Sequence, residues 1–396
     1  MRRSHCKIHA QLVTTTLVSH LVAALQLRAY QTSVPARLLA RLLLLATATG
    51  RSLSALAKDC AAAPSDESVR LALRYQLPAT SLLLLDHLLD ALHHLVPPPV
   101  RRGRPVGCAI DLHFRPYYGA KDTPGTCGAK KVAGTKRFWG YATLVVLQRG
   151  LRLTVGLCPV DTRQSLVVAV RTLVAQARRK GIRIKWLLLD RGFYDAQIVQ
   201  YLQDQQLPFV MPLIRRGNAA AGTGTQRFFR AEAVGWHTYA WTARPRFWDE
   251  AKQKKRKGPA LTVQIDVCVV ARPRGKVWAF ACWNIGWEGA LVAQRYRSRF
   301  GIETSYRQLG ECLALTTSKD ERVRLLLVGV ALLVRQYWVW VHYMELAQVQ
   351  ANGHRQLQPQ RLRLQALLLW LVLTLARAVR LRLEIVLGTT HEKSNT

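Results

Sequence analysis

The chain has 396 residues, of which 58 are lysine or arginine and 23 are aspartate or glutamate, giving a formal charge of +35 at pH 7. This excess points to a polyanionic partner, because each basic side chain set against a phosphate releases counterions. With 49% hydrophobic residues and eight cysteines that occur singly, the composition excludes a merely basic tail, and it indicates neither a zinc module nor a disulfide framework.

Residues 1–96 are rich in leucine and alanine at helical spacing, and we predict a helical N-terminal domain that binds DNA ends. The opening segment lacks the apolar run of a signal peptide, so secretion is not expected. Residues 52–78 indicate two helices around a Pro-Ser break, the second with Arg70 and Arg74 on one face. A DNA-reading helix-turn-helix and an ordinary helical hairpin fit this outline equally well.

Residues 97–107, PPPVRRGRPVG, predict a stiff linker rich in proline and arginine. Its basic side chains are Arg101, Arg102 and Arg104. This composition is typical of segments that enter an A·T-rich minor groove, but a plain solvated linker or simple phosphate contact explains it as well.

From residue 106 the sequence pattern changes to that of alternating strands and helices. We predict three meandering strands, then helix, strand, helix and strand, over residues 106–114, 137–147, 151–160, 162–181, 184–190, 196–206 and 207–213. This is the element order of the RNase H-like fold, an α/β fold with a mixed sheet. Residues 108–214 would form the first part of the catalytic domain.

Residues 215–285 interrupt this order and predict a β-rich insertion. The run KQKKRKG at 252–258 is expected as a basic loop, either a solvated tip or a contact for phosphates. Its central side chains are Lys254, Lys255 and Arg256.

The remainder is predicted to be helical, with residues 286–345 completing the catalytic domain and 346–396 forming a C-terminal region for dimerisation. One helix is expected over 288–311. The apolar segments 325–334 and 366–376 fall short of the roughly 18 to 20 residues that span a bilayer, and an arginine ends each. We therefore expect buried helices and no membrane partner.

Two aspartates stand at the ends of apolar strand segments. Asp111 ends CAID, and alternation places it on one face with Ala109 and His113. Asp190 ends LLLD, on a strand that the fold order places beside the first. Two such carboxylates repel each other unless a divalent cation neutralises them, and hard oxygen ligands favour Mg²⁺, with Mn²⁺ as a substitute. Two separate salt-bridged aspartates are the alternative.

A third acid, Glu303, lies on the predicted helix 288–311. Tyr296, Arg299, Glu303 and Arg307 fall within about 80° of arc on that helix. The group is either a surface ion pair or a metal ligand whose neighbours grip phosphates.

Three passages resemble the DDE transposases of insertion sequences, specifically the IS4-like group: AIDLHFRPYYG with Asp111, LLLDRGFYD with Asp190, and YRSRFGIETSYRQLG with Glu303. The last is similar to that group's Y-x2-R-x3-E-x6-K signature, at Tyr296 and Arg299. The resemblance covers roughly residues 100 to 345, including the β-rich insertion.

One position departs from this signature. The expected lysine falls on Gly310. Arg307 on the same helix face is the predicted substitute for its phosphate contact, and Lys319 is a second candidate. Without a substitute, the chain could be a decayed copy.

The resemblance implies an enzyme that cuts DNA at the ends of a mobile element and joins the freed 3′-OH to target DNA. It implies two Mg²⁺ ions bound by Asp111, Asp190 and Glu303, and second-strand cutting through a hairpin with a flipped base near Tyr296 and Arg299. The expected partners are double-stranded DNA, as terminal inverted repeats and target, and a second copy of the chain on DNA. The expected location is the cytoplasm of a prokaryote, at the nucleoid.

Two other functions fit the same sequence. A catalytically decayed or domesticated DNA-binding protein would bind without cutting, and an RNase H-like nuclease would cut without joining. A basic membrane-associated helical protein conflicts with the strand-rich middle of the chain.

Overall fold

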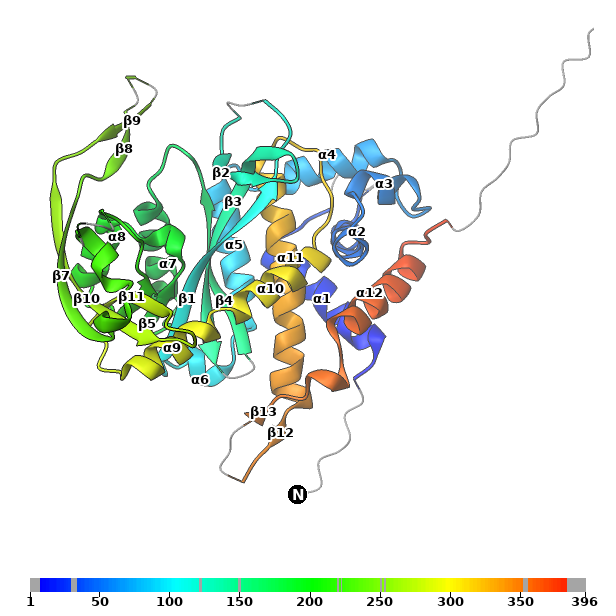
Figure 1. Ribbon diagram of the computed structural model, residues 1–396. Coiled ribbons are helices and arrows are strands. Elements are labelled where there is room, and N and C mark those ends of the chain that lie inside the picture. Colours follow the sequence, from blue (N-terminus) through cyan, green and yellow to red (C-terminus); the bar gives the residue numbers. More distant parts are fainter. Residues whose placement is uncertain are drawn as a thin grey trace, which may run out of the picture.

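The fold is described from a computed structural model, which describes residues 8–29, 34–120, 123–148, 151–218, 221, 223–249, 251–252, 254–351 and 355–382. A twisted mixed sheet lies beside a body of helices formed by both ends of the chain (Figure 1). The prediction of an RNase H-like mixed sheet with flanking helical regions is confirmed.

The sheet has nine strands in the order β2-β3-β1-β5-β6-β11-β10-β7, and β4 pairs with β3 outside this path. The pairs β1·β5 and β5·β6 are parallel and the other pairs are antiparallel. The strands are β1 (Val106–Pro116), β2 (Cys127–Val132), β3 (Thr135–Gln148), β4 (Leu151–Val160), β5 (Ile184–Leu189), β6 (Phe209–Pro212), β7 (Gly235–Ala243), β10 (Leu261–Ala271) and β11 (Val277–Trp283).

Helices cover both faces of the sheet, so its central strands are apolar on both sides. On one face, Cys108 and Ile110 share a core with α7 (Leu166–Arg179) and α8 (Ala196–Asp204). On the other, Ala109 shares a core with α9 (Gly289–Ser298) and α10 (Gly301–Glu311). The predicted alternation along β1 therefore holds.

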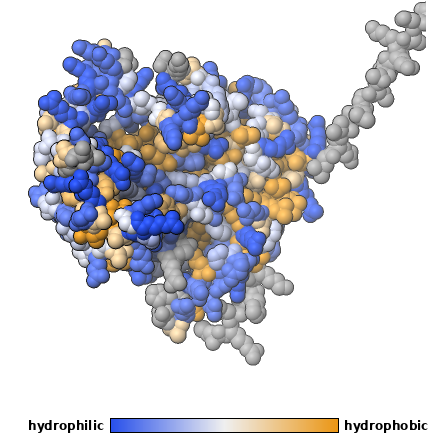
Figure 2. Space-filling view, in the orientation of Figure 1, coloured by the Kyte–Doolittle hydropathy of each residue, from blue (hydrophilic) through white to orange (hydrophobic). Residues whose placement is uncertain are grey.

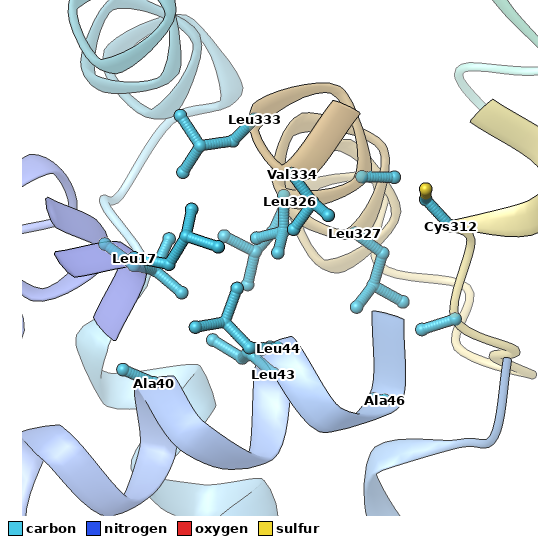
Figure 3. Packing of buried hydrophobic residues seen from close by; sticks show 14 of the residues in the cluster. Leu17, Ala40, Leu43, Leu44, Ala46, Cys312, Leu326, Leu327, Leu333 and Val334 are labelled. Atoms are coloured by element: carbon cyan, nitrogen blue, oxygen red, sulfur yellow. The ribbon is translucent and has the colours of Figure 1, made fainter. Parts of the chain in front are cut away.

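The helices before and after the sheet pack together. Leu17 of α1, Leu43 and Leu44 of α2, and Leu326 and Leu333 of α11 meet in one buried cluster (Figure 3). Because the two ends of the chain share this core, the division into separate domains stays a prediction. The helices are α1 (Ala10–Ala24), α2 (Ala36–Thr49), α3 (Leu53–Lys58), α4 (Asp66–Gln76), α5 (Ser81–His94), α11 (Glu321–Val341) and α12 (Leu364–Ala378).

The helix α11 differs from its prediction in length. With the π-turn His342–Leu346 it runs unbroken past Arg335, the residue expected to end the apolar segment. The combined helix is long and apolar enough to cross a bilayer by length and composition, but 89% of the most apolar window is buried inside the protein. A core helix accounts for it, as the sequence predicted.

The predicted β-rich insertion contains strands β7 to β11, of which β11, β10 and β7 continue the central sheet beyond β6. Two further predictions differ from the structure. The basic run was predicted as a loop, but most of it forms β9 (Lys254–Lys257), which pairs with β8 (Arg246–Asp249). The single helix predicted over 288–311 is two helices, broken between Ser298 and Gly301.

The remaining elements are short. The predicted linker contains one helical turn, α6 (Pro98–Arg101), and the C-terminal region contains a small hairpin between α11 and α12. The strands of this hairpin are β12 (Gln348–Val349) and β13 (Arg355–Gln356). The 3₁₀ turns are η1 (Arg191–Phe193), η2 (Gly224–Phe228), η3 (Ala231–Ala233) and η5 (Pro359–Arg361).

Candidate active site

The two strand-end aspartates lie on neighbouring strands. Asp111 is on β1, and Asp190 directly follows β5, whose last residue Leu189 pairs with Ile110. Both side chains belong to the face covered by α9 and α10, since Ala109 and Leu188, two positions earlier on each strand, lie in that core. Sheet order and register thus bring together two carboxylates that are 79 positions apart in sequence.

Glu303 joins them from the first turn of α10, where the helix dipole favours a carboxylate. One guanidinium, that of Arg299, links all three acids. Its Nη1 lies 3.1 Å from Asp111 Oδ2, and its Nη2 lies 3.3 Å from Asp190 Oδ1 and 3.8 Å from Glu303 Oε1. The three predicted acids therefore converge on one positive charge.

Arg299 is held in this position by its own surroundings. Its side chain is only 5% exposed, and its Nε donates a hydrogen bond of 3.2 Å to the hydroxyl of Tyr296. Burial opposes the charge, but Tyr296, Asp111 and Asp190 outweigh it and raise the pKa of Arg299. Tyr296 itself is buried, and burial raises its pKa to about 12. It orients Arg299, and its predicted contact with DNA stays a prediction.

Asp111 is the most buried of the three acids. Its Oδ1 accepts a hydrogen bond of 2.9 Å from the backbone N–H of Leu112. Burial raises the pKa of Asp111 to about 6, although Arg299 and this hydrogen bond act in the opposite direction. Asp190 and Glu303 add to the rise, so the site disfavours a third negative charge without a further cation.

The donor set fits a hard divalent cation. Within the described residues, no group of three acidic, histidine or cysteine side chains is arranged to hold a metal ion as it stands. Arg299 lies among the three carboxylates. All three acids nevertheless offer only oxygen ligands, which suit Mg²⁺ or Mn²⁺, and they already converge on one cation.

A second layer of contacts, which sequence reasoning missed, fixes α10 against the sheet and α11. The hydroxyl of Tyr306 lies 2.7 Å from Thr143 Oγ1 on β3, the residue paired with Asp111. From α11, Arg335 donates to Ser305 Oγ at 2.7 Å and to Gln308 Oε1 at 3.2 Å. Tyr306 is three residues after Glu303, and this helical spacing was the available signal.

The two candidates for the missing signature lysine lie close to this site in sequence. Arg307 is exposed one turn after Glu303 on α10. Lys319 is exposed in the connection between α10 and α11. Gly310 is also exposed, and a Cβ at that position would meet none of the described atoms within 4 Å. A side chain is therefore sterically possible at Gly310, but the chain has none.

The other predicted DNA contacts lie away from the three acids. Arg101, Arg102 and Arg104 are exposed before the start of β1, so Arg104 is about 23 Å of extended chain from Asp111. Arg70 and Arg74 lie on α4, where the predicted break is confirmed by the N-cap Ser65, and Arg70 pairs with Glu67. The exposed Lys254, Lys255 and Arg256 lie on β9, in the hairpin that projects from the sheet (Figure 1). Their contact with DNA stays a prediction.

The fold and the three acids define an RNase H-like domain with a carboxylate site. A family model described as "Transposase DDE domain" matches residues 102–334, and the chain belongs to this family. Among solved structures, a piggyBac transposase synaptic complex with hairpin DNA is similar in fold, with a TM-score of 0.53 and 11% identity, over 97% of this chain and 84% of that one. None of the curated proteins matches the chain.

Proposed function

We propose that the chain is a DNA transposase of the IS4-like group that cuts insertion-sequence ends and joins the 3′-OH ends to target DNA. The observation that carries the proposal is the convergence of Asp111, Asp190 and Glu303 on one cation inside a transposase DDE domain. The formal charge of +35 supports a DNA partner.

Asp111, Asp190 and Glu303 would hold two Mg²⁺ ions, with Mn²⁺ as a substitute. Such ions, when bound, supply an activated hydroxyl nucleophile and stabilise the leaving 3′-oxygen. The protein's own part is to place the three acids on rigid elements, two at the sheet and one on α10. Arg299 contacts all three carboxylates. Arg307, one turn after Glu303 on α10, would contact a phosphate beside the scissile bond.

A dimer on DNA is part of this proposal, because two element ends require two active sites. The helix α12 carries Leu369 and Leu373, which are 56% and 62% exposed and one turn apart. An exposed apolar pair on a helix surface supports an additional contact there. The proposed setting is the cytoplasm of a prokaryote, at the nucleoid.

The test uses the DNA that flanks the reading frame. Short inverted repeats on both sides, cut by the purified protein with Mg²⁺ and joined to a target plasmid, are the expected result. Cutting without joining would identify an RNase H-like nuclease, and salt-dependent binding without cutting would identify a decayed DNA-binding protein. Either result contradicts the proposal.

A further inference from the structure

Surface charge does not single out a further site. Figure 2 shows hydrophilic residues over much of one face of the molecule, with smaller hydrophobic areas between them. Buried polar side chains are more informative, because each needs a partner inside the protein. Five of them gather around the carboxylate site and α10: Asp111, Thr143, Arg299, Ser305 and Arg335.

Glu303 is the least constrained of the three acids. Its side chain is 59% exposed, whereas those of Asp111 and Asp190 are 11% and 42% exposed. Its ion pair with Arg299 is also the longest of the three, at 3.8 Å. An ion pair of this kind, with one exposed partner, contributes little to holding a side chain in place. The position of Glu303 therefore depends on how the helix α10 is fixed.

One side chain of α10, that of Tyr306, contacts both sheet neighbours of Asp111. The neighbour across the sheet is Thr143, which pairs with Asp111 in register, and the Tyr306 hydroxyl lies 2.7 Å from Thr143 Oγ1. The neighbour along β1 is His113, two positions further on the same face. The rings of His113 and Tyr306 stack, with centroids 5.1 Å apart and planes at 28°. Tyr306 thus joins α10 to the sheet at the place where Asp111 lies.

The path from Asp111 to Glu303 through Tyr306 is short. Residues directly opposite each other on neighbouring strands are about 4.5 to 5.5 Å apart at Cβ, and residues two positions apart on one strand are about 7 Å apart. Tyr306 and Glu303 are three positions apart on α10, which places their Cβ atoms about 5 to 6 Å apart. Because Tyr306 touches both neighbours of Asp111, a shift of α10 that broke these contacts would also move Glu303.

Tyr306 also lies at the junction of two buried clusters. It packs against the cluster of Ala109 and Leu188 on the sheet face, and against the cluster formed by the helices at both ends of the chain. Burial raises the pKa of Tyr306 well above its ordinary value, and the charge of Asp111 adds to the rise. The hydroxyl therefore keeps its proton, and with its partner Thr143 it fixes the direction in which the ring points.

We propose that Tyr306 is a positioning residue that sets the spacing between Asp111 and Glu303. It does so through its contacts with His113 and Thr143, and it acts on metal binding through Glu303. The proposal rests on the proposed function, since this spacing matters to the reaction only if the acids hold metal ions. Groups that orient metal ligands typically change metal affinity by about 10- to 100-fold, which sets the size of the expected effect.

The test measures Mn²⁺ binding to the full chain without DNA, by EPR titration at a temperature well below unfolding. Tyr306→Ala removes the ring and the hydroxyl, and it is expected to weaken Mn²⁺ binding by about 10- to 100-fold. Tyr306→Phe keeps the ring and loses only the hydrogen bond with Thr143. Its loss of affinity is expected to lie between those of the wild type and Tyr306→Ala.

The stacking partner His113 gives an independent comparison. His113→Ala removes its ring and should also weaken Mn²⁺ binding. His113→Phe keeps a flat ring against Tyr306 and should bind Mn²⁺ with nearly wild-type affinity. The Nε2 atom of His113 is buried and makes no hydrogen bond within the described residues, so a phenyl ring gives up no contact at that atom. Rescue by phenylalanine would show that the stack with Tyr306 is what the site requires.

A double substitution and a matched control separate positioning from general stability. Tyr306→Ala/Glu303→Gln should bind Mn²⁺ no more weakly than Glu303→Gln alone, because the ligand that Tyr306 positions is already missing. The control is Tyr337→Ala. Tyr337 is a buried tyrosine of α11 that stacks on Trp340, with ring centroids 5.7 Å apart. Its removal should lower the Tm as Tyr306→Ala does, but leave the Mn²⁺ affinity unchanged.

Wild-type Mn²⁺ affinity in Tyr306→Ala and His113→Ala would overturn the proposal, as would fully additive losses in the double variant. Should Tyr306→Ala fail to fold, Tyr306→Phe and the two His113 variants carry the same comparison. Mg²⁺-dependent cutting by the wild-type chain is measured in parallel. If the wild type cuts DNA while the Tyr306 and His113 variants bind Mn²⁺ normally, only the positioning proposal fails. If the wild type neither binds Mn²⁺ through Glu303 nor cuts DNA, the proposed function fails and the positioning proposal fails with it.

Discussion

Asp111→Asn is expected to stabilise the metal-free protein, because the folded site disfavours the Asp111 charge. The pKa of Asp111 rises from the ordinary value of 3.8 to about 6, chiefly through burial. At neutral pH, a pKa rise of this size means that the charged Asp111 lowers the free energy of unfolding by about 3 kcal/mol. Asparagine keeps a similar shape, carries no charge and can still accept the hydrogen bond from Leu112 at Oδ1. Its amide nitrogen cannot accept the bond that Arg299 Nη1 donates to Oδ2 of Asp111, so the gain is below this figure by the value of that bond.

The sign of the pH dependence follows from linkage. Between about pH 4 and pH 6 the folded state binds a proton that the unfolded state has released, so metal-free wild-type stability falls as pH rises through this window. Asp111→Asn lacks this fall. The difference in free energy of unfolding between Asp111→Asn and the wild type should therefore be near zero below about pH 4 and reach its full value above about pH 6.

Thermal unfolding in EDTA across pH 3.5 to 8 measures this difference. For 396 residues the unfolding entropy is about 0.8 kcal/mol/K, so about 3 kcal/mol corresponds to a Tm increase of about 4 °C. Asp204→Asn, which changes an exposed acid at the end of α8, is the matched control and should show no such pH-dependent gain. A lower Tm for Asp111→Asn at pH 7 in EDTA would refute the reasoning. Mg²⁺ should raise the Tm of the wild type more than that of Asp111→Asn.

Three further substitutions test other parts of the site. Arg299→Gln removes the cation among the three acids and should raise the Mn²⁺ affinity of the DNA-free protein about tenfold in an EPR titration; an unchanged or weaker affinity would show that Arg299 does not compete with metal. Arg335→Ala removes bonds to Ser305 and Gln308 and should lower the free energy of unfolding by about 3 kcal/mol and speed hydrogen exchange in α10; unchanged exchange there would contradict the anchoring role. Asp195→Ala removes the N-cap of α8 and should lower the free energy of unfolding by about 1 kcal/mol while DNA cutting stays intact. Loss of cutting at unchanged stability would instead show that Asp195 belongs to the active site.

Much of the sheet was predictable because its strands carry local signals. The four residues before Asp190, Trp186 to Leu189, are all apolar and buried, as expected for a central strand covered on both faces. The alternation along β1 then placed Asp111 on a definite face. Asp195, directly before α8, has the side chain of a typical helix cap, and it accepts a hydrogen bond from the backbone N–H of Gln197 at 2.8 Å. Local chemistry was sufficient in each of these cases.

Two of the predictions that failed depended on contacts distant in sequence. The helix over 288–311 looked continuous, but it breaks where Arg299 turns in to reach Asp111, 188 positions away. Arg335 looked like the end of an apolar segment, but it lies inside the core, where its guanidinium donates hydrogen bonds to Ser305 Oγ and to the carbonyl oxygen of Arg152. The basic run at 252–258 differs for another reason. Its partner strand β8 is close in sequence, but the run has no apolar alternation to indicate a strand.

The central claim is that Asp111, Asp190 and Glu303 form one metal-dependent site that cuts DNA at element ends. The direct measurement maps strand cuts on a plasmid that carries the reading frame with its flanking DNA, incubated with purified protein and Mg²⁺. The wild type and Asp204→Asn should cut at both ends and leave 3′-OH groups, whereas Asp111→Asn, Asp190→Asn and Glu303→Gln should bind the ends without cutting. Cutting that persists in all three acid variants would contradict the claim.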